Sequence, residues 1–280
     1  MAIVFGLLAA VFYGSADFCG GFATRRSPMF AVTVISQAVG LVLILAALPF
    51  FPGRPTAQAL EFGFIAGMCG GLGLLLLYHA LSIGKMGVVS PITAVLAALT
   101  PVIVGTARGE HLTNLKLAGI GVALLAVILI SLSTEADGTF EFSTAGVKEA
   151  IASGIILGGF YTFLALGGKE AGLYPIVSAR LGSIVLLLAI AVVMRRSIVA
   201  APAALGVIVL SGVLDMAANA FYVLAAAAGY LSIAAVLTSL YPASTVFLAR
   251  FVLGERLAPL QKAGVVCALA GVALIAAKLG

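Results

Sequence analysis

The sequence predicts an all-α membrane protein in which ten transmembrane helices form two inverted five-helix repeats. Three observations lead to this fold class. The composition is far more apolar than that of a soluble domain, ten apolar segments of membrane-spanning length follow one another along the chain, and the same apolar phrases occur in the same order in both halves.

The composition indicates that lipid is the solvent for most of the surface. Hydrophobic residues make up 63% of the 280 residues and charged residues 9%, against about 45–50% and about 25% in soluble domains. So few polar side chains could not cover a surface exposed to water. The net charge of +5 comes from basic residues that stand singly or in pairs between apolar runs, which is typical of contacts with the lipid bilayer and not of a nucleic-acid-binding face.

Charged residues, Gly and Pro divide the chain into apolar segments of about 20 residues, the length that crosses a bilayer. None shows the period-2 alternation of a membrane β-strand. The first segment lacks a basic region before it, so we expect it to remain as a helix and not to be cleaved as a signal peptide. In chain order, the predicted spans are 2–22, 30–49, 60–82, 87–107, 114–133, 146–167, 173–194, 203–226, 230–252 and 260–279.

Short connections bound these spans. RRSP (25–28) follows the first span, PGRP (52–55) the second and MRRS (194–197) the seventh. The longest polar stretch, TEADGTFEFSTA (134–145), lies at the midpoint and joins five spans to five. The predicted organisation is therefore a first repeat over 1–134, a polar connecting loop over 135–145 and a second, inverted repeat over 146–280.

The two halves share apolar phrases at nearly constant spacing. The matched pairs are GLLAAVFY (6–13) with GIILGGFY (154–161), Tyr78 with Tyr222, ITAVLAALTP (92–101) with IAAVLTSLYP (233–242), and GEHL (109–112) with GERL (254–257), at offsets of 148, 144, 141 and 145 residues. This collinear order indicates an internal duplication. Because each half has an odd number of spans, the second must enter the membrane from the opposite side, which predicts an inverted repeat with a substrate path at the repeat interface.

These features together resemble the drug/metabolite transporter superfamily, and most closely its EamA-type ten-helix members, over essentially the whole chain. The resemblance rests on ten apolar spans in a five-plus-five repeat, a proline late in the fourth and ninth spans, and the following G-E-x-L. It implies a secondary carrier of the bacterial cytoplasmic (inner) membrane, with a cavity lined by the first, third, fourth, sixth, eighth and ninth helices. We expect the branch that exports amino acids or similar small amphipathic metabolites. The chain departs from the family in having no Trp, so aromatic recognition must use Tyr and Phe.

Ionisable residues inside spans cost about 2.5–3.5 kcal/mol on insertion scales and therefore call for a reason. Asp215 lies near the middle of the eighth span, with Asn219 one turn later on the same face. They either bind a substrate ammonium or a proton, or form a structural hydrogen bond. Asp17 lies nearer the end of the first span, where a capping role is the alternative. Arg180 lies early in the seventh span and either snorkels to the interface or meets substrate.

Tyrosines are the second group of candidate binding residues. The hydroxyls of Tyr78 and Tyr222 need partners, which favours an orientation toward the cavity, although an interfacial aromatic belt would also explain them. His79 is either a cavity hydrogen-bonding or proton-sensitive group or a packing residue. The remaining candidates are the tyrosines on helices that the resemblance places around the cavity, namely Tyr13, Tyr161 and Tyr241.

Three prolines are candidate hinges. Pro91, Pro101 and Pro242 each remove a backbone hydrogen bond and are expected to kink the fourth and ninth spans. Glu110 and Glu255 precede the next span, where attraction to its helix dipole explains a carboxylate without a functional role. Small-residue runs such as GMCGGLG (67–73) are expected to allow close helix approach.

The sequence contains neither a metal-binding nor a catalytic motif, so we expect no cofactor and no enzymatic activity. The predicted partner is a small-molecule substrate, and a proton is one candidate coupling ion. Two other cargo classes stay open: multidrug or cationic compounds, and sugar phosphates or nucleotide sugars, which would want more basic residues than Arg180 alone. Monomer and homo-oligomer are both compatible with the sequence. More Lys and Arg residues follow odd-numbered spans than even-numbered ones, which predicts both termini outside.

Overall fold

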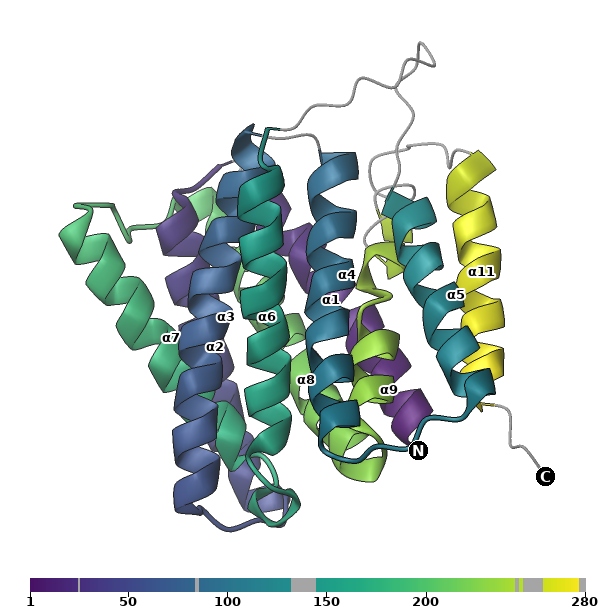
Figure 1. Ribbon diagram of the computed structural model, residues 1–280. Helices are drawn as coiled ribbons and strands as arrows, with labels where there is room; N and C mark the ends of the chain where they lie inside the picture. Colours follow the sequence, from purple (N-terminus) through teal and green to yellow (C-terminus); the bar gives the residue numbers. More distant parts are fainter. Residues whose placement is uncertain (25, 84–85, 132–144, 245–246, 249–258, 277–280) are drawn as a thin grey trace.

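The computed structural model describes residues 1–24, 26–83, 86–131, 145–244, 247–248 and 259–276, and the regular structure within these ranges is entirely helical (Figure 1). The α-helices are α1 (Ala2–Thr24), α2 (Met29–Ala47), α3 (Ala57–Ile83), α4 (Met86–Ala107), α5 (Asn114–Ser131), α6 (Val147–Leu166), α7 (Tyr174–Val193), α8 (Leu205–Ala228), α9 (Leu231–Thr238) and α11 (Pro259–Ala276). Short 3-10 turns lie at Leu48–Phe50, Lys169–Ala171 and Pro202–Ala204. The predicted all-helical class is confirmed.

Six helical segments of the described chain are long and apolar enough to cross a membrane: Ala2–Thr24, Met29–Phe50, Ala57–Leu77, Val147–Leu166, Tyr174–Val193 and Pro202–Ala228. Four shorter apolar helices accompany them, at Ile92–Ala107, Asn114–Leu129, Leu231–Ser244 and Lys262–Ile275. Each predicted span therefore corresponds to an apolar helix. That all ten cross the membrane stays a prediction.

The distribution of side chains suits a lipid-facing surface. The interior between helices is rich in Ala, Ser and Thr, such as Ala31 and Thr93, which are fully buried. Many large apolar side chains point outward, and Val42, Val185 and Leu269 are 67%, 56% and 68% exposed. Helices in lipid associate by close packing of small residues and not by removing apolar surface from water, so this arrangement is the expected one for a membrane protein.

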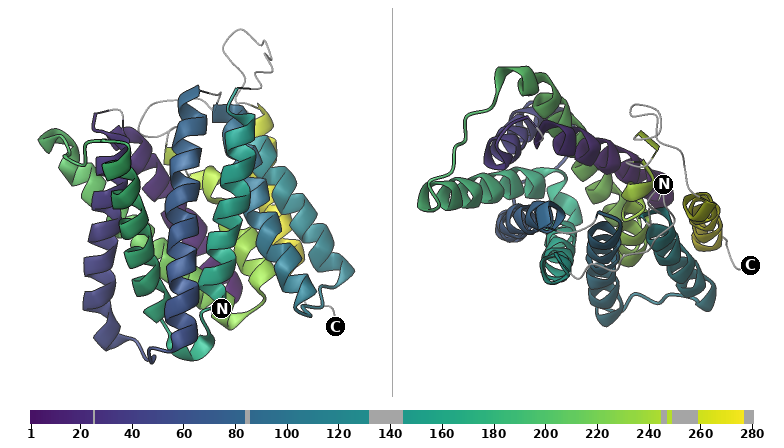
Figure 2. Two further views of the ribbon diagram at one scale, coloured as in Figure 1. Left: turned by 60° about the vertical axis from the view of Figure 1, so that its left-hand side comes forward. Right: turned by 90° about the horizontal axis from the view of Figure 1, so that it is seen from above.

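Helices pack mainly against helices of the other half of the chain. The most extensive contacts are α1 with α8, α3 with α7, α5 with α11, α3 with α6, and α4 with α6. When α1 to α5 are matched in order with α6 to α9 and α11, these contacts form equivalent pairs: α1–α8 corresponds to α3–α6, α2–α8 to α3–α7, and α1–α9 to α4–α6. This is the pattern that a two-fold relation between the halves would produce. Helices α5 and α11 pair at one edge of the bundle (Figures 1 and 2), which agrees with their absence from the cavity lining that the family resemblance implied.

Glycines allow the closest helix contacts. On α3, a Cβ at Gly67 would collide with the main-chain oxygen of Ala179 on α7, and on α7 a Cβ at Gly182 would lie 2.5 Å from the main-chain oxygen of Phe64. At the edge pair, a Cβ at Gly119 of α5 would lie 3.0 Å from the main-chain oxygen of Gly271 on α11. The predicted role of the small residues of α3 in close helix approach is thus confirmed.

The prolines have different effects on α4 and α9. Helix α4 is continuous through positions 91 and 101. Helix α9 ends at Thr238, and helical backbone resumes at Tyr241, one residue before Pro242. Pro242 has no N–H to continue the hydrogen-bond ladder, and Ser239 N instead closes the helix by donating to the main-chain oxygen of Ala235 at 2.9 Å. The expected distortion therefore takes the form of an interruption in α9. A hinge role for these prolines stays a prediction.

Candidate functional site

A polar cavity lies between the two halves of the bundle. It encloses about 700 Å³ of space free of protein atoms, including its opening. Leu74, Leu77, Leu157 and Ile176 contribute apolar surface. The polar lining consists of Tyr13, Asp17, Gln37, Tyr161, Arg180, Ser183, Asp215, Asn219 and Tyr241.

The helices around this cavity differ in part from those that the resemblance implied. Helices α1, α3, α6 and α8 line it as expected, and Tyr241 follows α9. Helices α2 and α7 contribute Gln37 and Arg180, whereas no α4 residue is among the described lining residues. The reason is that α2 packs against both α7 and α8 and the Arg180 side chain of α7 reaches Asp215 on α8, while α4 packs on α6 and α9.

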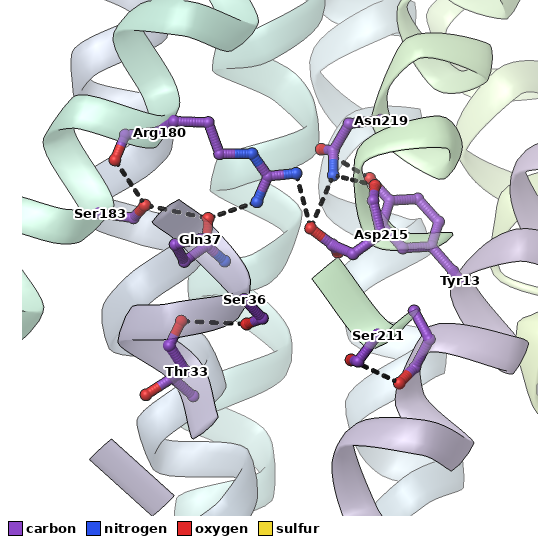
Figure 3. A network of polar contacts seen from close by, with 10 residues as sticks. Tyr13, Thr33, Ser36, Gln37, Arg180, Ser183, Ser211, Asp215 and Asn219 are labelled. Carbon is purple, nitrogen blue, oxygen red and sulfur yellow. Dashed lines mark hydrogen bonds and ion pairs between the residues drawn. The ribbon is translucent and has the colours of Figure 1, made fainter. Parts of the chain in front are cut away.

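An ion pair between α7 and α8 is the central polar contact of the cavity. Arg180 Nη2 lies 2.6 Å from Asp215 Oδ2, and 5% and 27% of the two side chains are exposed. Arg180 Nη1 donates to Gln37 Oε1 on α2, and Ser183 Oγ donates to the same oxygen at 3.1 Å (Figure 3). The pair thereby links three helices.

The predicted alternative that Arg180 snorkels to the interface is wrong. The side chain turns into the bundle because Gly40 on α2 leaves room for it. A Cβ at Gly40 would lie 3.0 Å from Arg180 Nε and 3.1 Å from Cζ, so any larger residue would press on the face of the guanidinium. A buried charge of this kind requires the partner that Asp215 supplies.

Asp215 and Asn219 share one face of α8, as their spacing predicts. Asn219 Nδ2 donates to the main-chain oxygen of Asp215 at 2.7 Å and to its Oδ2 at 3.3 Å. The Tyr13 hydroxyl donates to Asn219 Oδ1 at 2.8 Å. The carboxylate that meets Arg180 is therefore connected through an amide to α1 (Figure 3).

Asp17 contributes a second carboxylate to the cavity from α1. It lies one turn after Tyr13, on the same side of α1. Within the described part of the chain no hydrogen bond or ion pair fixes this carboxylate. Asp17 is therefore available to a bound molecule in a way that Asp215, already paired, is not.

Tyrosines from three helices pack into one cluster. The ring of Tyr161 lies 5.8 Å from Tyr13 in an edge arrangement and 4.9 Å from Tyr222. The Tyr222 hydroxyl donates to the main-chain oxygen of Tyr161 at 2.8 Å. Tyr222 is fully buried and does not line the cavity, so it supports Tyr161 from behind. The direct contact of Tyr222 with substrate that the sequence suggested is untested, and the absence of Tyr222 from the described cavity lining gives it no support.

The other predicted site residues lie away from the cavity or outside the described side chains. His79 is exposed on α3 and does not line the cavity. The side chains of Tyr78 and Pro91 lie outside the described residues, as does Glu255. Pro101 and Pro242 are both buried. Among the residues that the structure describes, no three His, Cys, Asp or Glu side chains group as a metal site would need.

Glu110 does not act on the following helix, as we expected, but on α9 of the other half. Its carboxylate accepts hydrogen bonds from Leu231 N at 2.6 Å, from Ser232 N at 3.2 Å and from Ser232 Oγ at 2.6 Å. The chain reaches α9 because Gly109 adopts a φ of 92° and turns it back over the end of α4. The Glu110 carboxylate thus binds the N-terminus of a helix, as predicted, but that helix is α9 and not α5.

Sequence reasoning missed Gln37 and Ser183. Gln37 is an amide inside an apolar span, which the cost of polar groups in lipid could have marked as a candidate. Ser183 lies three residues after Arg180, on the same face of α7. The hydrogen bonds of Gln37 with Arg180 and Ser183 could not be predicted from the sequence, because they depend on how α2 and α7 are rotated toward each other.

Comparisons with known proteins agree with this architecture. A family model described as the EamA-like transporter family matches residues 1–132 and 144–277. An uncharacterized protein of Methanocaldococcus jannaschii is 32% identical over 134 residues, which are 47% of this chain and 97% of that protein. A solved structure described as "Crystal structure of protein" matches 98% of this chain and 96% of its own, with a TM-score of 0.78 and 17% identity, and therefore shares the fold.

Proposed function

The chain belongs to the EamA-like transporter family, and from this premise we propose that it is a secondary transporter that exports amino acids or similar small amphipathic metabolites. The family is one of membrane transporters of small molecules and not of enzymes. The chain is a multi-pass integral membrane protein. We place it in the cytoplasmic (inner) membrane of a bacterium.

The observation that carries the proposal is a charged cavity inside an apolar bundle. Arg180, Asp215 and Asp17 face one space between α1–α3 of the first half and α6–α8 of the second. Ionisable groups at such depth are costly and mark substrate or ion pathways. Apolar residues beside them would accept the apolar part of an amphipathic molecule.

We propose that residues 1–134 and 146–280 are inverted repeats, joined by the loop 135–145, which exchange conformations during transport. The double match of the family model supports this proposal. So does a relative about as long as one half, and so do the equivalent helix contacts across the halves. In such transporters, a rocking motion of one repeat against the other opens a fixed site to each side in turn.

The charges of the cavity favour amphipathic cargo over phosphorylated cargo. Arg180 is the one basic residue among the described lining residues, and Asp215 already pairs with it. A phosphate would need further donors. A proton is the proposed coupling ion, since Asp17 and Asp215 could each hold a proton that a bound substrate displaces.

Uptake into proteoliposomes tests the function. Purified protein would be reconstituted and offered labelled amino acids one at a time, without nucleotide, with protein-free liposomes of the same lipid as the control. We expect saturable uptake of at least one amino acid. Uptake that matches the protein-free liposomes for every amino acid, from protein that is monodisperse and folded, would overturn the proposal.

A further inference from the structure

We propose that Arg180 binds the carboxylate of the transported molecule and that Asp215 and Asp17 bind its ammonium group, so that the cavity selects zwitterions. This inference rests on the proposed transport function and adds to it the charged groups of the substrate that the site recognises. It makes Arg180 the residue that separates amino acids from amines of the same shape.

The guanidinium of Arg180 has unused capacity to donate hydrogen bonds. Its Nη1 donates to Gln37, and its Nη2 approaches Asp215 as an ion pair. Nε has no hydrogen-bond partner among the described residues, and Arg180 is 4% exposed. A buried donor without a partner costs about 1–3 kcal/mol, so the site gains when a ligand supplies an acceptor.

The guanidinium edge that carries Nε and Nη2 is buried, and apart from the ion pair of Nη2 with Asp215 it has no partner among the described residues. Gly40 lies over the face of the group, since the position of its absent Cβ is nearly as close to Cζ as to Nε, at 3.1 and 3.0 Å. Acceptors bind guanidinium nitrogens at the edge and in the plane. Arg180 also lines the cavity. A carboxylate that takes the place of Asp215 can therefore bind Nε and Nη2 together in the two-pronged geometry that Arg favours.

Exchange of partners explains why the ligand needs both charges. When a carboxylate binds Arg180, Asp215 loses its counter-ion. An ammonium group on the same molecule would replace that counter-ion, and Asp17 in the same lining would supply a second carboxylate. A simple anion would leave Asp215 unpaired, and a simple amine would leave the free donor of Arg180 unused.

The lining also excludes close alternatives. Phosphate-bearing ligands carry more negative charge than one guanidinium can pair, and both carboxylates would repel them. Leu74, Leu77 and Ile176 offer an apolar surface to the side chain of a bound molecule. Leucine combines both charged groups with an apolar branch and is therefore a suitable probe.

The test compares three ligands of one shape on the full-length protein in detergent: leucine, 3-methylbutylamine, which lacks the carboxylate, and 4-methylpentanoate, which lacks the ammonium. Thermal stabilisation is measured across a concentration series. We expect leucine to bind at least about tenfold more tightly than either analogue, the factor that corresponds to one charge-assisted hydrogen bond. Equal stabilisation by the amine, or none by leucine, would overturn the inference.

Substitutions identify the residue responsible. Arg180→Lys keeps the charge but removes the planar pair of donors, and we expect it to abolish the preference for leucine over the amine. Arg196→Lys, at an exposed position, is the matched control and should keep it. If Arg180→Lys does not fold, the ligand comparison on the parent protein still decides. A protein that transports 3-methylbutylamine and not leucine would retain the proposed carrier function and refute only this inference.

Discussion

Breaking the Arg180–Asp215 pair should destabilise the protein unequally, depending on which partner is removed. The two charges lie 2.6 Å apart, a separation at which two unit charges attract by about 6 kcal/mol at an effective dielectric constant of about 20. Much of this attraction offsets the desolvation of the buried guanidinium. Asp215→Asn leaves that guanidinium, 5% exposed, without a counter-ion, and should cost about 3–5 kcal/mol.

Removal of the other partner should cost less. Arg180→Gln leaves a carboxylate that is 27% exposed to the cavity and still accepts a hydrogen bond from Asn219. Water in the cavity can solvate it, so we expect a cost of about 1–3 kcal/mol. The double variant should be more stable than Asp215→Asn alone, because it buries no unpaired charge. The coupling between the two sites then exceeds the cost of Arg180→Gln alone, which is about 1–3 kcal/mol.

Thermal unfolding provides the assay. The chain has no Trp but three cysteines that are free in the structure, so a thiol-reactive fluorophore can report their exposure. A change of 1 kcal/mol corresponds to about 2–4 °C in proteins of comparable length, which predicts that the midpoint of Asp215→Asn falls by about 6–20 °C. Arg196→Gln, at an exposed position, is the control. Additive effects of the two substitutions, or a larger loss for Arg180→Gln, would refute the reasoning.

Three further predictions concern contacts between helices. Glu110→Ala removes three hydrogen bonds to the start of α9 and should lower the free energy of unfolding by about 1–2 kcal/mol. Glu110→Gln should lower it by less than Glu110→Ala does. An unfolding midpoint that Glu110→Ala leaves unchanged would contradict this prediction. Gly182→Ala brings a methyl group to 2.5 Å from the main-chain oxygen of Phe64 and should destabilise the protein, whereas Gly206→Ala, which meets nothing within 4 Å, should not. Tyr222→Phe removes the hydrogen bond to Tyr161 and should cost about 0.5–1.5 kcal/mol without changing which substrates are transported; altered selectivity would place Tyr222 in contact with substrate.

Properties that depend on one helix at a time could be predicted from the sequence. The length and apolarity of a segment set the position of a membrane helix, so each predicted span corresponds to an apolar helix. The spacing of Asp215 and Asn219 likewise places them on one face of α8, where they form a hydrogen bond. Both results require only the geometry of a single helix.

Contacts between helices could not be predicted in the same way. The pair of Arg180 with Asp215 depends on the rotation of α7 and α8, and a snorkelling side chain was an equally reasonable expectation at that position. The carboxylate of Glu110 reaches Leu231, 121 residues away, although α5 follows it directly in sequence. Gln37 matters because Gly40, one turn later, opens α2 to the guanidinium of Arg180. Packing in three dimensions determines these contacts.

Counterflow in proteoliposomes tests most directly the claim that this cavity belongs to an alternating-access carrier. Vesicles loaded with unlabelled leucine are diluted into a trace of labelled leucine, without nucleotide and without an ion gradient. A carrier that exchanges substrate across the membrane should accumulate label transiently above its equilibrium level and then release it. Label that rises to equilibrium without this overshoot, or that does not enter at all, would contradict the account.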